Sequence, residues 1–296
     1  METVVIDGDN LTLEMVKAVS LGSMEVSLSS DSRERMQASR KAVEDILDSG
    51  EVVYGINTGF GALSSVRIED SQLEELQSNL VRSHACGIGE TMEPDIVLMM
   101  MTIRANSLAK GVSGIRPSVV DTLLGMVNSR IAPSIPRIGS LGASGDLAPL
   151  SHMTMGMMGE GECLVQVAGK WVSKDSRTAL EEAGLEPVKL QAKEGLSLIN
   201  GTSQMCAYLT QTVLNMEILC LTADASIACS VEAIRGSHRP FDRRVHDSRP
   251  QVGQSISAAR ISAFLSQSNI EISHENCERV QDAYSFRCAP QVHGPV

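Results

Sequence analysis

Aromatic residues are scarce in this chain of 296 residues, at 3%, and there is a single Trp. We therefore expect a core packed mainly by aliphatic side chains and by many of the 15 Met. Basic residues are also in deficit, and the net charge of −11 disfavours non-specific binding to nucleic acid. The arginines between residues 235 and 249 are accordingly interpreted as partners in ion pairs.

Long apolar runs and paired cysteines are missing as well. The most apolar run, residues 96–103, is far shorter than the roughly 20 residues that cross a bilayer, so no membrane partner is predicted. The amino terminus, METVVIDGD, is acidic and does not resemble a secretory signal. The seven cysteines are scattered without a C-x-x-C pair. They predict free thiols in a reducing compartment and a cytoplasmic location.

Several patterns that carry chemistry in other protein classes are absent. There is no G-x-x-x-x-G-K-[ST] phosphate loop and no H-E-x-x-H metal helix. His274 and Cys277 have a possible ligand spacing, but two ligands without a second pair are weak grounds for zinc, so no metal is predicted. The run from Gly142 to Asp146 is not a G-x-S-x-G nucleophile elbow, because its fifth residue is Asp.

Apolar spacing predicts a mainly α chain with a small mixed α/β region at its start. Strands are expected at residues 3–6 and 25–28, and a hairpin at 163–172. Helices are expected at residues 11–20, from 31 to Gly50, at 69–85, at 94–110, after Pro117 and at 252–265. Residues 54–65 are rich in Gly, Asn, Ser and Thr, which is typical of a long mobile loop.

Residues 202–234 form a long stretch without Pro or Gly and are rich in Leu, Met, Ala and Ile. Apolar residues occupy nearly the whole circumference, which is typical of a helix buried inside a bundle. Two domains are therefore predicted. Residues 1–200 form the first, and residues 201–296 form the first part of a helical bundle.

The most informative segment reads SLGASGDLAPL at residues 140–150. Within it, Ala143-Ser144-Gly145 can become an electrophile without a bound cofactor. Attack of the Gly145 nitrogen on the Ala143 carbonyl, with loss of two waters, gives a methylidene-imidazolone ring. Ser144 supplies the hydroxyl that leaves, and Gly145 has no Cβ to block the approach. Small residues with Gly and Pro more often mark a plain loop, so the surroundings decide.

Five segments in this order resemble the aromatic amino acid ammonia-lyases, the family of histidine, phenylalanine and tyrosine ammonia-lyases and related aminomutases. They are SLGASGDLAPL, YGINTGFG at 54–61, NLVRSHACG at 79–87, LINGT at 198–202 and QDAYSFRCAPQ at 281–291. The resemblance covers almost the whole chain. It implies a long-helix bundle, a ring formed from residues 143–145 and no external cofactor.

The resemblance also gives roles to side chains that look ordinary by themselves. Tyr54 would remove the β-proton of the substrate, and Arg287 would bind its carboxylate through a bidentate fork. Asn200 would hydrogen-bond near the electrophile and the amino acid end of the substrate. Gln281 and Tyr284 would hold and orient the electrophile, the substrate or the leaving ammonia. Without the resemblance, packing, helix capping and surface charge explain these residues equally well.

Ser83 and His84 bear on the substrate. Histidine-acting members of the family carry Ser-His at this place, tyrosine-acting members tend to have His-Leu, and phenylalanine-acting members Phe-Leu. The pair here implies an imidazole-bearing substrate, whose ring His84 can hydrogen-bond. The ordinary alternative is a histidine that interacts with the end of its helix. Ser83 and Asp146 are assigned supporting roles, with Asp146 fixing the geometry of the tripeptide.

The resemblance therefore implies conversion of L-histidine to trans-urocanate and ammonia. Family members are considerably longer, so we expect a homotetramer or an assembly with a chain that supplies the carboxy-terminal half. Two alternatives remain open. The substrate is tyrosine or phenylalanine, or the chain is a catalytically silent assembly subunit.

Overall fold

The computed structural model divides into two compact units, Met1–Gln211 and Thr212–Val296. It describes residues 2–61, 64–143, 145–272 and 279–296. Ser144, His274 and Cys277 lie outside the described residues.

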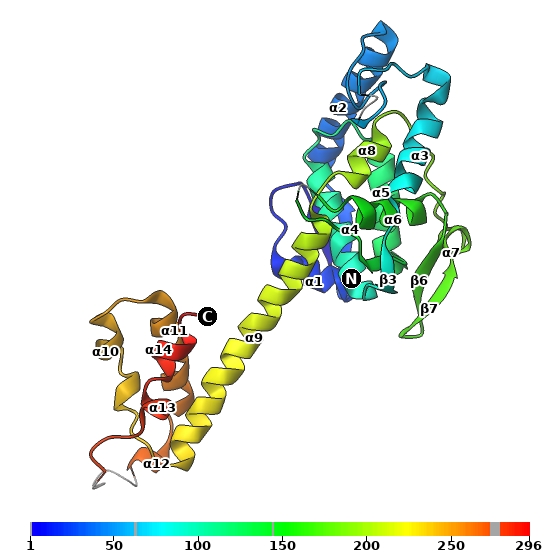
Figure 1. The fold of residues 1–296 in the computed structure, drawn as a ribbon. Coiled ribbons are helices and arrows are strands. Elements are labelled where there is room, and N and C mark those ends of the chain that lie inside the picture. Colours follow the sequence, from blue (N-terminus) through cyan, green and yellow to red (C-terminus); the bar gives the residue numbers. More distant parts are fainter. Residues whose placement is uncertain (1, 62–63, 144, 273–278) are drawn as a thin grey trace. The chain divides into compact units, whose positions relative to one another are not determined.

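The first unit is mainly helical, as the sequence predicted (Figure 1). Its α-helices are α1 (Leu13–Ser20), α2 (Ser30–Ser49), α3 (Leu73–His84), α4 (Pro94–Ala109), α5 (Pro117–Asn128), α6 (Leu147–Met157), α7 (Ser176–Glu182) and α8 (Glu194–Ile199). Gly50 ends α2 in the left-handed conformation, at φ 72°, as expected of a C-terminal glycine. Pro94 and Pro117 each open a helix, where the missing N–H costs nothing.

Short strands complete the first unit. Strands β1 (Thr3–Ile6) and β2 (Glu25–Leu28) pair in parallel, and β3 (Ile88–Thr91) pairs antiparallel with β5 (Pro136–Ile138). A third sheet has the order β4-β6-β7, from β4 (Ile131–Pro133), β6 (Glu162–Val167) and β7 (Lys170–Asp175). The predicted hairpin is confirmed. Its two turn residues, Ala168 and Gly169, have φ values of 49° and 79°, which suit a two-residue connection between twisted strands.

Helix α4 lies at the centre of the first unit (Figure 1). It packs against α1, α2, α5 and β4, and all six residues from Ile96 to Met101 are buried. The run that looked too short for a membrane is therefore a core helix with apolar side chains on every face. Methionines fill much of this core, among them Met99, Met100, Met101 and Met126, as the scarcity of aromatic residues predicted.

The second unit is helical. It contains most of α9 (Ser203–Ala233), together with α10 (Arg243–Asp247), α11 (Val252–Leu265), α12 (Asn269–Ile272), α13 (Tyr284–Arg287) and α14 (Ala289–His293). Its small core gathers Val231, Phe241, Ile261 and Leu265. Two of the clustered arginines form ion pairs as predicted, because Arg243 contacts Asp247 at 3.0 Å and Arg244 contacts Asp242 at 2.7 Å.

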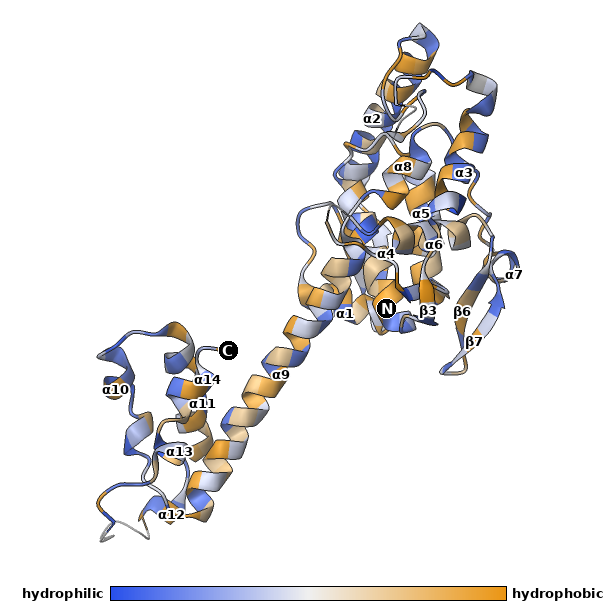
Figure 2. Cartoon of the chain, in the orientation of Figure 1, coloured by the Kyte–Doolittle hydropathy of each residue, from blue (hydrophilic) through white to orange (hydrophobic). Residues whose placement is uncertain are grey.

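The long helix α9 is present as predicted, but its burial is not. Hydrophobic residues follow one another along it (Figure 2), and Leu209, Ile218 and Leu219 are each more than half exposed. The stretch Glu194–Ala233, which takes in α8 and α9, is long and apolar enough to cross a membrane by length and composition, and 17% of its most apolar window is buried. Apolar residues on every face are equally typical of a helix inside a bundle, and several of those on α9 are exposed in the described part of the chain.

The two units meet within α9, between residues 211 and 212. The domain boundary predicted from the sequence, between residues 200 and 201, lies at the turn between α8 and α9 and not at the division between the two compact units. Because compact units need not coincide with domains, the predicted boundary stays a prediction.

Candidate active site

The Ala-Ser-Gly segment lies in the connection between β5 and α6. Gly142 has a φ of 70°, a conformation that L side chains rarely adopt. Ala143 is exposed, whereas Gly145 is buried. A Cβ on Gly145 would lie 3.0 Å from the Gly201 carbonyl oxygen, so the backbone of another segment occupies the space that a side chain would need.

Asp146 fixes the carboxy-terminal side of the segment. Its backbone N–H donates to the Gly201 carbonyl at 2.7 Å, and its carboxylate is fully buried. One carboxylate oxygen accepts from the Ser140 hydroxyl at 2.6 Å. The other accepts from the backbone N–H groups of Gln204 and Met205, at 2.8 and 3.0 Å. The carboxylate thus caps the amino-terminal end of α9 and ties the segment to it at the same time.

Asn200 and Gly201 form the turn that receives Gly145. Asn200 is the C-terminal cap of α8, and its side chain is exposed. Beneath this turn lies Arg104 of α4, whose guanidinium donates to the carbonyl oxygens of Ser197 and Asn200, the latter at 3.0 Å. Asn200, which was predicted to contact the substrate, therefore lies at the surface of the first unit, in a turn whose carbonyl groups are hydrogen-bonded to buried Arg104.

His84 is the last residue of α3 and is half-buried. Its Nδ1 lies 2.8 Å from the Leu80 carbonyl oxygen, which can only accept, so Nδ1 carries the proton. The Ser83 hydroxyl donates to the same carbonyl at 2.9 Å. This is the helix-end interaction that the ordinary interpretation expects. It also leaves Nε2 of a neutral His84 as a hydrogen-bond acceptor.

The chain that follows His84 contacts the flanks of the Ala-Ser-Gly segment. The Gly87 N–H donates to Nε2 of His152, on α6, at 3.1 Å. A Cβ on Gly139 would lie 3.1 Å from the Gly87 Cα and 3.2 Å from the Ala148 Cβ. Burial lowers the pKa of His152, which favours the neutral ring that this acceptor role requires.

The loop that begins at Tyr54 packs against α8. A Cβ on Gly55 would lie 2.7 Å from Cδ2 of Leu196, so the loop and helix are in close contact. Buried Asn57 holds the loop from within, because its amide donates to the Glu51 carbonyl at 2.7 Å. Tyr54 is 58% exposed, and its ring meets that of Phe60 edge to face with the ring centroids 6.2 Å apart. The first unit therefore gathers the Tyr54, His84, Gly145 and Asn200 segments around α3, α6 and α8, which pack on one another.

Gln281, Tyr284 and Arg287 belong to the second unit. Gln281 and Tyr284 are exposed, and Tyr284 and Arg287 are three residues apart on α13, which places them on one face. The Arg287 Nε is buried and has no hydrogen-bond partner in the described part of the chain. A guanidinium with an unused donor is suited to an incoming carboxylate.

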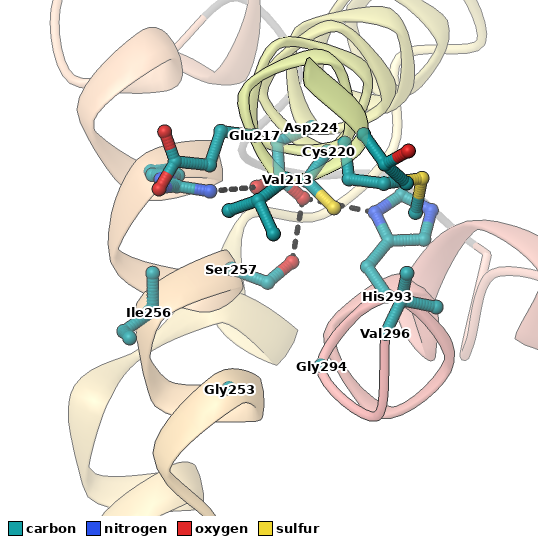
Figure 3. A pocket seen from close by; sticks show the side chains of 13 residues that line it. Val213, Glu217, Cys220, Asp224, Gly253, Ile256, Ser257, His293, Gly294 and Val296 are labelled. Carbon is teal, nitrogen blue, oxygen red and sulfur yellow. Dashed lines mark hydrogen bonds and ion pairs between the residues drawn. The ribbon is translucent and has the colours of Figure 1, made fainter. Parts of the chain in front are cut away.

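A cavity of about 410 Å³ lies in the second unit between α9, α11 and the last residues of the chain (Figure 3). Asp224 is its polar centre: it accepts from the Ser257 hydroxyl at 2.6 Å and from Nδ1 of His293 at 2.9 Å. Arg260 adds an ion pair at 3.8 Å. None of the residues predicted from the sequence lines this cavity, so cavity size is no guide to the site here.

Two buried residues that position the site were not predicted. Arg104 directly follows the apolar run at residues 96–103 of α4, and that charge in a core pattern is the signal that sequence reasoning could have used. Gln77 of α3 accepts from the backbone N–H groups of Gly195 and Leu196 at 3.0 and 3.4 Å, which ties α3 to α8. Nothing in its sequence context marks it. No cluster of metal-ligating side chains occurs among the residues that the structure describes.

The fold is similar to those of solved ammonia-lyases and aminomutases. The chain belongs to the aromatic amino acid lyase family, whose model matches residues 11–296.

Individual relatives agree with this assignment. A histidine ammonia-lyase from Anaeromyxobacter sp. strain K is 47% identical over 99% of this chain and 59% of its own length. The crystal structure of histidine ammonia-lyase from Trypanosoma cruzi superposes with a TM-score of 0.87 at 38% identity, over 100% of this chain and 53% of that one. Tyrosine aminomutase from Streptomyces globisporus gives 0.88 at 36% identity, over 99% and 58%. The chain thus spans somewhat over half the length of the relatives it matches.

Proposed function

We propose that this chain carries catalytic machinery of a histidine ammonia-lyase, which converts L-histidine to trans-urocanate and ammonia. The observation that carries the proposal is the set of contacts that holds Gly145 and Asp146 against Gly201. These contacts hold the glycine of the one Ala-Ser-Gly tripeptide in the sequence. Similarity to named histidine ammonia-lyases at 44–47% identity supports the choice of substrate.

The residues present fit a ring closed from Ala143, Ser144 and Gly145. Closure forms a bond from the Gly145 nitrogen to the Ala143 carbonyl carbon. The Ala143 oxygen leaves as water with the amide hydrogens of Ser144 and Gly145, and the Ser144 hydroxyl leaves as water with the Ser144 Hα. Only glycine fits at position 145 without displacing its neighbours, because the Gly201 carbonyl oxygen lies 3.0 Å from where a Cβ would be. Once formed, such a ring supplies an electrophilic carbon to which an amine can add, which makes the amine a better leaving group.

Three side chains are suited to holding an amino acid with an imidazole ring. Arg287 has an unused donor for the carboxylate, and Asn200 offers an exposed amide beside Gly201. His84 presents Nε2 as an acceptor, which matches the N–H of a neutral imidazole. A phenol O–H also donates, so tyrosine is the second candidate substrate. A phenyl ring has no donor, which disfavours phenylalanine.

Proton removal falls to Tyr54. Its exposed position on a loop that contacts α8 lets it approach a substrate held near Asn200. A phenol acts as a base only as its anion, so the assembled site has to stabilise the phenolate. Gln281 and Tyr284 are proposed to orient the substrate or the departing ammonia, and Ser83 to support His84.

We also propose that other helices cover α9 in the working enzyme. The exposed apolar side chains of α9 are the support for this, together with the fraction of the relatives' length that the chain spans. A homotetramer or a second polypeptide would supply the helices, and the second-unit residues would then serve a site shared between chains. The cytoplasm is the proposed location, because the described cysteines are all free.

The test is turnover of L-histidine, L-tyrosine and L-phenylalanine in parallel, with the Ser144→Ala variant as control. The expected result is urocanate from L-histidine with the wild-type chain and none with Ser144→Ala. Coumarate instead of urocanate would favour the tyrosine reading. A cyclised but inactive chain would favour a catalytically silent subunit. The molar mass from light scattering would then show whether the chain is a monomer, in which no second chain covers α9.

A further inference from the structure

Arg104 is a buried cation without a carboxylate. Its side chain lies inside the first unit, and the residue is 5% exposed. Among the residues that the structure describes, it forms no ion pair, and its Nε has no hydrogen-bond partner. Burial lowers the pKa of the guanidinium to about 10. Such a charge is costly to place in a core, and the packing of α4 would be served as well by an apolar residue.

Apart from one hydrogen bond from Nη1 to the Ser107 hydroxyl on the same helix, at 3.3 Å, the polar contacts of the Arg104 guanidinium lie at one place. Its Nη2 donates to the carbonyl oxygens of Ser197 and Asn200, at the carboxy-terminal end of α8, where free carbonyls and the helix dipole favour a cation. A Cβ on Gly201 would lie only 2.1 Å from Nη1. The guanidinium is therefore pressed against the Asn200–Gly201 turn from the core side.

The same turn receives the proposed electrophile. The Gly201 carbonyl accepts from the Asp146 N–H at 2.7 Å and occupies the Cβ position of Gly145. We propose that Arg104 is a positioning residue for ring closure: it fixes the Asn200–Gly201 turn, and the turn fixes Gly145 so that its nitrogen can reach the Ala143 carbonyl. This inference rests on the proposed function.

Ring closure is sensitive to such support. The Gly145 nitrogen has to come within bonding distance of a carbonyl two residues earlier, a conformation that a free loop visits rarely. Holding one flank in place raises the effective concentration of the reacting groups, and small displacements lower the rate steeply. Arg104 lies behind the turn, so it acts through Gly201 and does not itself touch the reacting atoms.

The experiment measures the fraction of cyclised chain in folded, soluble protein by intact mass, with circular dichroism as the measure of folding. Arg104→Met keeps the buried stem and removes the fork. Gly201→Ala keeps Arg104 but displaces it. Arg33→Met is the matched control, because Arg33 forms an exposed ion pair with Asp121. We expect wild type and Arg33→Met to lack two waters, and folded Arg104→Met and Gly201→Ala to retain them in at least nine-tenths of the chains.

Arg104→Lys keeps the charge with a single point of contact, so it is expected to give a mixture of the two masses. It decides the matter if Arg104→Met does not fold. Full cyclisation of any folded Arg104 variant would overturn the inference and leave the proposed function standing. Absence of the mass loss in wild type would instead overturn the proposed function, and the inference with it.

Discussion

Replacing Asp146 separates the capping role of its carboxylate from its charge. The wild-type carboxylate is fully buried and accepts three hydrogen bonds, from the Ser140 hydroxyl and from the N–H groups of Gln204 and Met205. Hydrogen bonds to a charged group contribute about 1.5–3 kcal/mol each and do not add fully. Asp146→Ala removes all three and leaves two N–H groups of α9 unsatisfied. We expect the free energy of unfolding to fall by about 3–5 kcal/mol.

Asp146→Asn is the informative partner of that variant. The amide oxygen of the Asn side chain can still accept from the α9 N–H groups. Its NH₂ group can donate to the Ser140 hydroxyl, which then accepts a hydrogen bond where it donates one in the wild type. It loses only the charge, so about 1–2 kcal/mol is expected. The assay is denaturant unfolding followed by circular dichroism, with Asp121→Asn as an exposed control whose expected change is below about 1 kcal/mol. An Asp146→Ala chain as stable as wild type would refute the argument that this carboxylate joins the loop to α9.

Three further outcomes are expected. Burial lowers the pKa of His152 below the value of the unfolded chain, so the unfolded chain binds the proton more tightly. Stability should therefore fall as the pH drops below about 6.5. His152→Gln keeps an acceptor for the Gly87 N–H, and its melting temperature should depend less on pH than that of the wild type. The same pH dependence of the melting temperature in both proteins would contradict this expectation. Burial raises the pKa of the Cys163 thiol to about 11, so mass mapping after iodoacetamide at about pH 8 should show exposed Cys206 alkylated and Cys163 intact. Arg287→Lys should lower kcat/KM for L-histidine roughly tenfold to hundredfold because a point charge replaces a fork, and unchanged kinetics would remove Arg287 from the carboxylate site.

Features written in local sequence were predictable. Proline at the first turn and glycine at the end placed the bounds of α2, α4 and α5 within a few residues. The hairpin followed from two turn residues between alternating strands. His84 meets Leu80 one turn earlier on the same helix, so even its tautomer follows from local geometry. Each of these depends on neighbours within a few positions of the chain.

Features that depend on distant segments were not predictable. Asp146 directly precedes α6 and looks like the cap of that helix, yet its carboxylate caps α9, 58 residues further along. Arg104 meets the α8 carbonyls across more than 90 residues. Helix α9 carries the pattern of a buried helix, but no single-chain periodicity reveals which surfaces cover it. The partners of Asp146 and Arg104 and the burial of α9 are determined by tertiary contacts and not by local secondary-structure propensity.

Intact mass of the purified wild-type chain, with peptide mapping of residues 140–150, tests most directly whether this protein makes its own electrophile. We expect a chain lighter than its sequence by two waters, with the whole deficit in the peptide that contains Ala143, Ser144 and Gly145. Ser144→Ala, which has no hydroxyl to lose, should be lighter by one water at most. Full sequence mass in a wild-type preparation that releases ammonia from L-histidine would show that the reaction needs no ring formed from these three residues.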